Sequence, residues 1–308
     1  MKTEKRSTAL RRRLAEPGIL TVPGVYDSLS ARICEMAGFE AVFHSGYGTA
    51  ASRLCMPDVG LLSLTEMAAS VRSISRAVGI PVLSDADNGF GNAVNVVRTV
   101  EEYVTSGAAG LFIEDQAMPK RCGHMSGKSV IPWPEMDGKL RAALETRDEL
   151  DPDFLIMCRI DSLAVNGFDD ALGRAKSAVG TGADLIFIEA LETTDQMRQA
   201  CSEVKAPMML NLIEGGRTPL VSYDEAEEMG FRLVVPALTA LYAAARGMYD
   251  IMRRVRTEGV SLNYKDRLFD FKEFAEIVRL DKIEEMERRY LPEEDLSERY
   301  GGGRNRIV

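Results

Sequence analysis

Two aspartates at alternate positions, Asp85 and Asp87, are the first residues of this sequence whose type and spacing could do chemistry. They end a short apolar run, and in an extended chain their side chains point to the same side. Two ionised carboxylates held together are costly unless a cation or a shared proton offsets their repulsion. Glu114 follows another apolar run and adds a third carboxylate. An all-oxygen set of this kind favours Mg²⁺, with Mn²⁺ as an alternative.

A basic, glycine-containing loop carries the second chemically suggestive group. Cys122 follows two cations, Lys120 and Arg121, and precedes Gly123 and His124. Because nearby positive charge favours the thiolate, the sequence predicts a lowered pKa for this cysteine. The glycines of the loop would let it open and close over a site. A basic surface loop with an incidental cysteine is the alternative.

Further polar side chains stand at the ends of other apolar runs. Arg159 could bind a carboxylate with both arms of its guanidinium. Asp27 and Asp58 fit a helix cap and a turn, and His44 fits a packed, hydrogen-bonded interior position. The other members of this set are Ser45, Gly46, Tyr47, Asp161, Glu189, Asn211 and Glu214.

Eight short apolar runs alternate with stretches of helical period, and these elements must position the polar residues. Apolar strands separated by helices are typical of a parallel sheet covered on both faces. Eight units in about 240 residues predict an α/β fold of the (β/α)₈ barrel type, with its site at the carboxyl ends of the strands. The turn after the first run lacks a G-x-G-x-x-G fingerprint. The predicted strands are 19–25, 41–44, 81–84, 110–113, 154–158, 185–188, 208–212 and 232–235.

Two more helical regions, 241–256 and 269–289, follow the eighth unit. They exceed what a barrel needs, so we expect these extra C-terminal helices to pack on a neighbouring subunit. We therefore divide the chain into a catalytic barrel, residues 1–260, and a C-terminal helical extension and tail, residues 261–308, that belong to the same domain. The Gly- and charge-rich tail is expected to fray.

Composition excludes several classes of protein. The 308 residues carry 38 Lys and Arg against 47 Asp and Glu, a net charge of −9, whereas nucleic-acid binders show a basic surplus. The longest nearly apolar run, 233–245, is too short to span a bilayer. The N-terminus lacks a secretory apolar segment, and Leu10 and Leu14 predict a surface helix there. Five scattered cysteines do not suggest a disulfide framework, so we expect a cytoplasmic protein without nucleic-acid or membrane partners.

Five specific motifs are present: Ser45-Gly46-Tyr47-Gly48, Pro57-Asp58-Val59-Gly60, Asp85-Ala86-Asp87-Asn88-Gly89-Phe90-Gly91, Glu114-Asp115-Gln116 and Lys120-Arg121-Cys122-Gly123-His124. With them the chain resembles the isocitrate lyase/phosphoenolpyruvate mutase superfamily from about Leu14 to Arg289, and the last motif resembles the signature of its lyase branch. The resemblance implies a (β/α)₈ barrel whose final helix is swapped between subunits. It also implies a homotetramer, built as a dimer of dimers, and Mg²⁺ at the barrel rim.

The resemblance also implies roles for individual residues. Asp87 would ligate the metal directly, and Asp85 and Glu114 would act through water. Cys122 and Arg159 would be catalytic, with Cys122 the general acid that protonates carbon after a C–C bond breaks. The general base is not identified, although Tyr47 is a candidate. The implied substrate contacts are Ser45, Gly46, Tyr47, Gly123, His124, Arg159, Glu189 and Asn211.

The implied reaction cleaves a 2-hydroxy dicarboxylate into a 2-oxo acid and a short carboxylate. Methylisocitrate lyases carry an arginine for the third carboxylate where this chain has Tyr242, and a second arginine expected near 269–273 is absent. A buried carboxylate without a cation costs on the order of several kcal/mol. An alkylmalate such as 2,3-dimethylmalate, giving pyruvate and propionate, therefore fits better, and Tyr242 and Leu241 would suit its alkyl groups.

Other activities of the superfamily are the alternatives. A methylisocitrate lyase or an oxaloacetate hydrolase or decarboxylase comes second. Phosphonopyruvate mutase or hydrolase chemistry is disfavoured, because that branch lacks the Cys-Gly-His signature.

Overall fold

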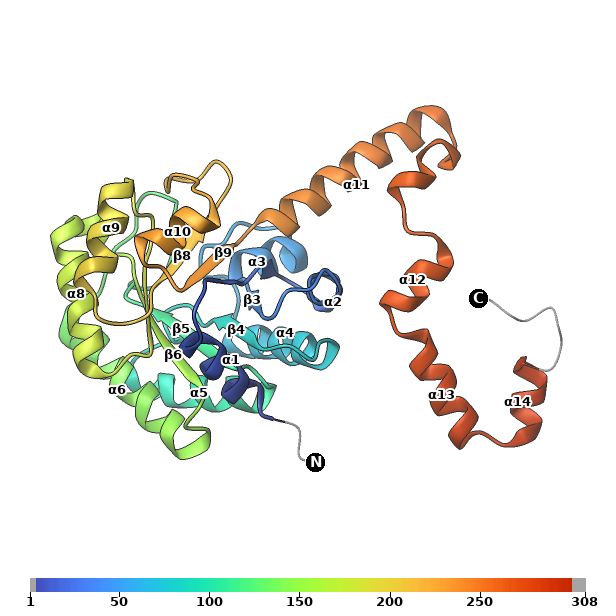
Figure 1. The fold of residues 1–308 in the computed structure, drawn as a ribbon, viewed down its shortest axis with the longest axis horizontal. Helices are drawn as coiled ribbons and strands as arrows, with labels where there is room; N and C mark the ends of the chain where they lie inside the picture. The colour runs from blue at the N-terminus through green and yellow to red at the C-terminus, as the bar shows by residue number, and fades with distance from the viewer. Residues whose placement is uncertain (1–3, 301–308) are drawn as a thin grey trace. The chain divides into compact units, whose positions relative to one another are not determined.

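A closed parallel barrel is the centre of the first of two compact units, which ends at Ala243 (Figure 1). The computed structural model describes residues 4–300. Six strands pair in the order β2-β3-β4-β5-β6-β7 and three in the order β1-β9-β8. A parallel bridge from Ile186 to Met208 joins the two sheets on one side, and β1 and β2 are consecutive parts of the first predicted strand. The strands are β1 Leu20–Thr21, β2 Gly24–Val25, β3 Val42–His44, β4 Val82–Asp85, β5 Gly110–Glu114, β6 Leu155–Ile160, β7 Leu185–Ile188, β8 Met209–Leu212 and β9 Leu233–Pro236.

Helices cover the outside of the strands (Figure 1). Their starts follow local chemistry: Asp27, Ser63, Asn92 and Ser222 each cap a helix through a reciprocal capping box, as expected for Asp27. The helices of this unit are α1 Arg6–Ala15, α2 Ser28–Met36, α3 Gly46–Leu54, α4 Leu64–Ala77, α5 Ala93–Ser106, α6 Trp133–Leu150, α7 Leu163–Asn166, α8 Phe168–Thr181, α9 Thr194–Glu203 and α10 Tyr223–Met229. The predicted (β/α)₈ architecture is therefore confirmed.

Two hydrophobic layers hold the barrel together. The larger one lies between the outward-facing strand residues, such as Ile113 and Ile156, and inward-facing helix residues such as Val96 and Leu140. The second fills the interior of the barrel with side chains such as Phe43, Phe112 and Phe187. Leu10 and Leu14 of α1 belong to this inner layer, so the predicted first helix packs on the barrel.

The second compact unit begins at Ala244 and is helical. Its elements are α11 Thr239–Glu258, which starts in the first unit, the 3₁₀ helix η1 Leu262–Arg267, α12 Phe271–Ile277, α13 Leu280–Tyr290 and α14 Glu293–Tyr300. The tail predicted to fray is helical as far as Tyr300, and its remainder lies outside the described residues. The boundary predicted at residue 260 falls within this unit. Within residues 4–300, no helix is both long and apolar enough to cross a membrane.

Candidate active site

A polar ring stands directly above the apolar interior of the barrel. Side chains two residues apart on a strand point to the same side. On β5, Phe112 belongs to the inner layer and Glu114 follows two residues later, and on β6 Arg159 follows Met157 in the same way. The same step leads from Leu83 to Asp85, from Phe187 to Glu189 and from Met209 to Asn211. The ring therefore lies at the carboxyl ends of the strands, where (β/α)₈ enzymes carry their active sites.

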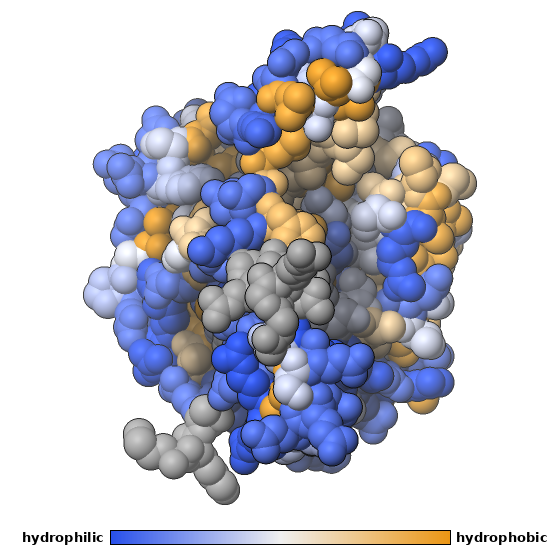
Figure 2. Space-filling model, turned by 90° about the vertical axis from the view of Figure 1, so that its right-hand side faces the viewer, coloured by the Kyte–Doolittle hydropathy of each residue, from blue (hydrophilic) through white to orange (hydrophobic). Residues whose placement is uncertain are grey.

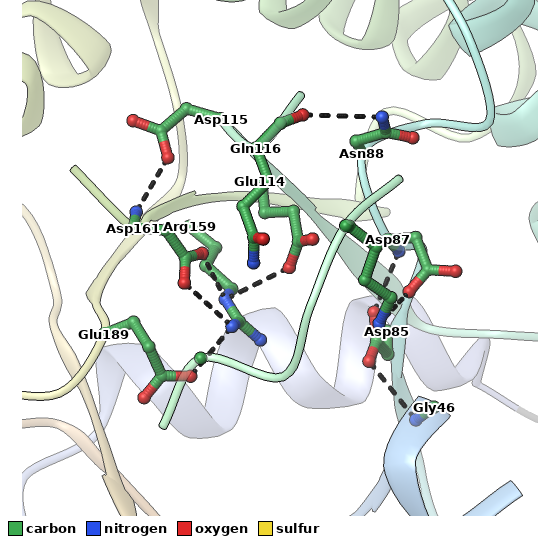
Figure 3. Close-up of polar contacts among 12 residues, drawn as sticks. Gly46, Asp85, Asp87, Asn88, Glu114, Asp115, Gln116, Arg159, Asp161 and Glu189 are labelled. Carbon is green, nitrogen blue, oxygen red and sulfur yellow. Dashed lines mark hydrogen bonds and ion pairs between the residues drawn. The ribbon is translucent and has the colours of Figure 1, made fainter. Parts of the chain in front are cut away.

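The turn after β4 holds Asp85 and Asp87 in place (Figure 3). Asp85 Oδ1 accepts a hydrogen bond from the Asp87 N–H at 2.8 Å, and its Oδ2 accepts one from the Gly46 N–H at 3.2 Å. Asp87 has a φ of +47°, a left-handed conformation that costs about 1–2 kcal/mol for a residue other than glycine. The turn thus brings two buried carboxylates to one end of the barrel.

Arg159 lies among three carboxylates (Figure 3). Its Nε is 2.8 Å from Asp161 Oδ2 and 3.3 Å from Glu114 Oε2, and its Nη2 is 3.0 Å from Glu189 Oε2. Glu114 and Arg159 are direct partners in the parallel register of β5 and β6, which explains their contact. The guanidinium therefore links the ends of β5, β6 and β7.

One two-donor edge of the Arg159 guanidinium binds an internal carboxylate. Its Nε and Nη2 bind Asp161 at 2.8 and 3.1 Å, so an internal carboxylate occupies the geometry expected for the substrate. The rings of Phe112 and Phe187 each lie 5.3 Å from the guanidinium carbon and help to fix its plane. Within the described residues, Nη1 has no hydrogen bond or ion pair, so this nitrogen is the donor left for a ligand.

Carboxylates outnumber cations around the ring. Burial raises the pKa of Asp87 to about 7, although Lys120 opposes the rise. Burial likewise raises the pKa of Glu114 well above its usual value, against the charge of Arg159. A further cation would relieve this repulsion. In the described part of the chain, the carboxylates are Asp58, Asp85, Asp87, Glu114, Asp161 and Glu189, and the cations are Lys120, Lys128 and Arg159.

The donor set fits a hard divalent cation. Both side-chain oxygens of Glu114 are buried without a hydrogen-bond partner among the described residues. Asp87 Oδ1 is 2.5 Å from Lys120 Nζ, so a metal would share this carboxylate with the lysine or displace it. Among residues 4–300, no three His, Cys, Asp or Glu side chains are grouped closely enough to hold an ion. A Mg²⁺ site with one direct carboxylate and several waters does not require such a group.

The ionisation state predicted for Cys122 is wrong. Burial raises the pKa of this thiol to about 11, and the charges of Glu189 and Asp58 act in the same direction. The nearby cation Lys120 does not lower it, because its ammonium is paired with Asp58 at 2.6 Å and Asp87 at 2.5 Å. Cys122 is therefore a protonated thiol at neutral pH, which is the form that a general acid needs.

Contacts on both sides of Cys122 hold its loop against the barrel. The Cys122 N–H donates to the Asp58 carbonyl at 3.0 Å. His124 Nδ1 accepts a hydrogen bond from the Arg217 N–H at 2.9 Å, which places the proton of a neutral ring on Nε2. That nitrogen is 3.1 Å from Glu189 Oε1. The loop is thus tied to the segments after β7 and β8.

Gly123 fits its place because it has no side chain. A Cβ at this position would come within 2.3 Å of Glu189 Cγ and Oε2. Lys128 Nζ, on the same loop, is 3.0 Å from Asp161 Oδ1 and also donates to the Gly123 carbonyl. The loop therefore lies directly on the carboxylates that surround Arg159.

Helix α3 begins at the site, and sequence analysis did not predict it. Ser45 caps this helix by accepting a hydrogen bond from the Gly48 N–H at 3.1 Å. Burial, and secondly the neighbouring Tyr47 side chain, raise the pKa of Tyr242 to about 12. In the described residues, the cavity wall includes Tyr47 and Leu238 but neither Tyr242 nor Leu241. Tyr242 thus reaches the cavity through Tyr47.

These groups surround a small cavity of about 40 Å³, well below the roughly 300–1,000 Å³ of sites that hold drug-sized ligands. Arg159 is the one cation that the described residues contribute to its wall. Four of the predicted site residues, Gly46, Asp87, Glu114 and His124, are not part of this wall. The polar lining includes Ser45, Tyr47, Asp58, Asp85, Cys122, Gly123, Arg159, Glu189 and Asn211, and the apolar lining includes Phe43, Phe112, Phe187, Met209, Ile213 and Leu238.

Asp58 differs from its predicted role as a turn residue, because it lines the cavity and pairs with Lys120. Lys120 and Lys128 were recognised only as part of a basic loop. The excess of acidic residues at the strand ends was the signal that could have identified them, since buried carboxylates require cations. His44 is packed as expected, between Ser84 Oγ at 2.8 Å and Thr49 Oγ1 at 2.9 Å, and burial lowers its pKa to about 3.

A (β/α)₈ barrel whose carboxyl end holds buried carboxylates, an arginine and a protonated thiol defines an enzyme that acts on small molecules. The family model described as phosphoenolpyruvate phosphomutase matches residues 10–256. The chain therefore belongs to this family, within the PEP mutase/isocitrate lyase superfamily.

Several curated proteins are similar over most of the chain. A 2,3-dimethylmalate lyase of Eubacterium barkeri is 41% identical over 281 residues, covering 91% of this chain and 96% of the relative. A chloroplastic carboxyvinyl-carboxyphosphonate phosphorylmutase of Arabidopsis thaliana is 43% identical, and the match covers 94% of this chain and 86% of the relative. A 2-methylisocitrate lyase of Aeropyrum pernix is 39% identical, and the match covers 89% of this chain and 88% of the relative.

Solved structures support the same assignment. The crystal structure of 2,3-dimethylmalate lyase superposes with a TM-score of 0.88 at 35% identity, covering 93% of this chain and 96% of that one. The structure of oxaloacetate acetylhydrolase in complex with the inhibitor 3,3-difluorooxalacetate has a TM-score of 0.88 at 34% sequence identity. The match covers 92% of this chain and 98% of that one. The structure of phosphonopyruvate hydrolase in complex with oxalate and Mg²⁺ has a TM-score of 0.85 at 28% sequence identity. The match covers 94% of this chain and 100% of that one. The chain is an enzyme of the lyase branch.

Proposed function

We propose that this enzyme is a Mg²⁺-dependent carbon–carbon lyase that cleaves an alkyl-substituted 2-hydroxy dicarboxylate, such as 2,3-dimethylmalate, into pyruvate and propionate. The cavity carries this proposal, because its wall combines a single cation, three carboxylates whose charge a bound Mg²⁺ would offset, several apolar side chains and a protonated thiol. The similarity to a 2,3-dimethylmalate lyase supports it.

The cavity wall suits the charge of a dicarboxylate. Arg159 offers Nη1, and a bound metal would meet the other carboxylate. A third carboxylate would face side chains such as Phe43, Met209 and Leu238 without a cation, which is unfavourable in a desolvated site. The same side chains would bury the methyl groups of an alkylmalate at about 0.8 kcal/mol for each carbon removed from water.

Cys122 acts as the general acid. A base removes the proton of the substrate hydroxyl, the C2–C3 bond breaks, and its electron pair remains on C3, delocalised into the attached carboxylate. The Cys122 thiol then transfers its proton to C3, and the thiolate is reprotonated in the turnover from solvent or from the base. With the loop lying on Glu189 and Asp161, water is kept from the carbanion.

Tyr47 is the base candidate that the cavity favours. It lines the wall, on the helix that follows Ser45, and its side chain neighbours that of Tyr242. Asp85, Asp87 and Glu114 would hold Mg²⁺, or Mn²⁺ in its place. When bound, the metal would supply positive charge for the oxygens of the 2-oxo-acid half of the substrate.

The assembly proposed is a homotetramer in which the C-terminal helices are swapped between subunits. The second unit does not bury several of its own large apolar side chains, including Phe269, Phe271, Ile283, Met286 and Tyr290. Hydrophobic patches are visible among hydrophilic residues on the surface in Figure 2. Size-exclusion chromatography with light scattering tests the tetramer.

A cytoplasmic location is proposed from the five cysteines, all of them free thiols.

A substrate panel tests the activity. Purified enzyme with Mg²⁺ is given 2,3-dimethylmalate, 2-methylisocitrate, isocitrate, oxaloacetate and phosphonopyruvate, and the product acids are quantified. We expect the highest kcat/KM on 2,3-dimethylmalate, loss of activity in EDTA, and recovery with Mg²⁺ or Mn²⁺. The highest kcat/KM on 2-methylisocitrate or oxaloacetate would refute the substrate assignment, and full activity in a metal-stripped sample would refute the metal.

A further inference from the structure

The turn that carries Asp87 has an unfavourable backbone conformation. Asp87 and Phe90 have φ values of +47° and +57°, and Gly89 and Gly91 have +82° and +150°. Left-handed residues other than glycine persist only where the surrounding structure holds them. The turn therefore needs strong anchors.

Consecutive carbonyls of this turn are each held by a donor. The Ala86 carbonyl accepts from the Gly89 N–H at 2.9 Å, and the Asp87 carbonyl accepts from the Glu114 N–H at 2.9 Å. The Gly89 carbonyl accepts from Thr99 Oγ1 of α5 at 3.1 Å. Asn88, labelled in Figure 3, also reaches the Gln116 carbonyl with its Nδ2 at 3.4 Å.

The Asn88 carbonyl is held by a buried lysine. Lys139 Nζ, from α6, donates to it at 2.9 Å, and the lysine side chain is only 1% exposed. A charged ammonium in the interior is costly unless its hydrogen bonds compensate. Burial lowers the pKa of Lys139, and the charges of Glu135 of its own helix and of Glu114 oppose this shift. Lys139 has no part in the chemistry proposed above, yet it contacts the segment that carries Asp87.

We propose that Lys139 is a positioning residue that holds the turn 86–91 so that Asp87 is preorganised for a divalent cation. The inference rests on the proposed metal site. Its hydrogen bond fixes the carbonyl of Asn88, the residue after Asp87. Because Asn88 and Asp87 share a peptide bond, a shift of the Asn88 backbone also displaces Asp87. Lys139 thereby connects the outer helix α6 to the carboxyl end of β4.

Two opposing effects make this proposal testable by the sign of a change. If Lys139 acted only through its charge, removing it would abolish repulsion toward a divalent cation and tighten metal binding. If it positions the turn, removing it lets the strained backbone relax away from the bound geometry and weakens binding. The direction of the change in Mg²⁺ affinity distinguishes these roles.

The experiment measures Mg²⁺ binding to the full-length enzyme by isothermal titration calorimetry in the absence of substrate. Lys139→Met keeps the length and removes the ammonium, and we expect the Mg²⁺ dissociation constant to rise about tenfold or more, the scale of one lost hydrogen bond to a charged donor. The matched control is Leu140→Ala, the next residue of α6 and fully buried. It should lower the melting temperature and leave the dissociation constant within about twofold, because the Leu140 side chain packs in the outer hydrophobic layer and makes no hydrogen bond to the turn.

Each outcome decides the proposal. Unchanged or tighter Mg²⁺ binding in Lys139→Met overturns it while leaving the metal site intact. Equal weakening in Leu140→Ala also overturns it, since the effect would then be general destabilisation. Wild-type enzyme that binds no Mg²⁺ overturns both the metal site and this role. Should Lys139→Met not fold, Lys139→Gln, a shorter side chain without the charge, is measured against the same expectation.

Discussion

His124 Nε2, on the loop that carries Cys122, lies 3.1 Å from Glu189 Oε1 at the end of β7. Burial disfavours the charged form of Glu189, yet Arg159 and His124 outweigh burial and lower its pKa to about 2. The carboxylate is therefore ionised at every pH at which an enzyme of this kind would work. The position of the loop therefore depends on a permanent anion.

Gly123→Ala should displace the loop without unfolding the protein. The added Cβ would meet Glu189 at 2.3 Å, and a shift of about 1 Å in a catalytic group can cost about 10²-fold in rate. We expect that loss in kcat with a nearly unchanged melting temperature. Gly138→Ala, in α6 with no atom within 4 Å of its new Cβ, is the control and should keep wild-type kcat. A Gly123→Ala enzyme as active as the control would show that the loop does not need this position.

Cys122→Ser should abolish most proton transfer to carbon, because a hydroxyl is a far weaker acid than a thiol. We expect kcat to fall by roughly 10²–10⁴-fold, or about 3–5 kcal/mol, with little change in KM. Cys201→Ser, at a half-buried free thiol of α9, should behave as wild type. Steady-state kinetics on the best substrate of the panel decide it, and kcat within a few-fold of wild type removes Cys122 from the mechanism.

Alkylation of Cys122 should be slow at neutral pH and accelerate steadily with alkali. Its pKa of about 11 means that the reactive thiolate increases about tenfold for each pH unit below that value. Peptide mass spectrometry after iodoacetamide treatment measures the rate at each pH. The guanidinium-unfolded protein serves as the reference and should level off near the ordinary thiol pKa, about 8.5. A plateau at that pH in the folded enzyme contradicts the raised pKa.

Tyr242→Arg should shift substrate preference toward a tricarboxylate. The new guanidinium would stand beside Tyr47 at the cavity wall and could pair with a third carboxylate. We expect the ratio of kcat/KM for 2-methylisocitrate to that for 2,3-dimethylmalate to rise by about tenfold. Tyr249→Arg, at an exposed position of the same helix, should leave the ratio unchanged. A ratio that does not move in Tyr242→Arg indicates that the third carboxylate is bound elsewhere.

The barrel and the residues of its rim could be predicted because their signals are local. A short apolar run that is followed by Asp85, Glu114 or Arg159 indicates a strand. The charged residue also indicates that the carboxyl end of this strand meets the site. Helix α3 escaped prediction because Gly46 and Gly48 lower helix propensity and its start depends on the Ser45 cap.

The ionisation of Cys122 could not be predicted from its neighbours in sequence. Lys120 is adjacent along the chain, but its charge is neutralised by Asp58 and Asp87, which lie many residues earlier. The partner of Arg159 depended in the same way on distances through space. Sequence spacing indicated which groups gather at the rim, while their pairing required the folded structure.

The apolar layer beneath the ring, in which the Phe112 ring lies 5.7 Å from Phe43 and 6.0 Å from Phe187, has a consequence for how this sequence can change over time. A hydrocarbon floor screens charge poorly, so each ionised group above it responds to all the others. Neutralising Glu189 alone would remove the carboxylate that pairs with both Arg159 and His124, and replacing Arg159 alone would leave three anions facing one another. Substitutions in the ring are therefore tolerated in compensating pairs, whereas exposed positions on the outer helices are free to diverge one at a time.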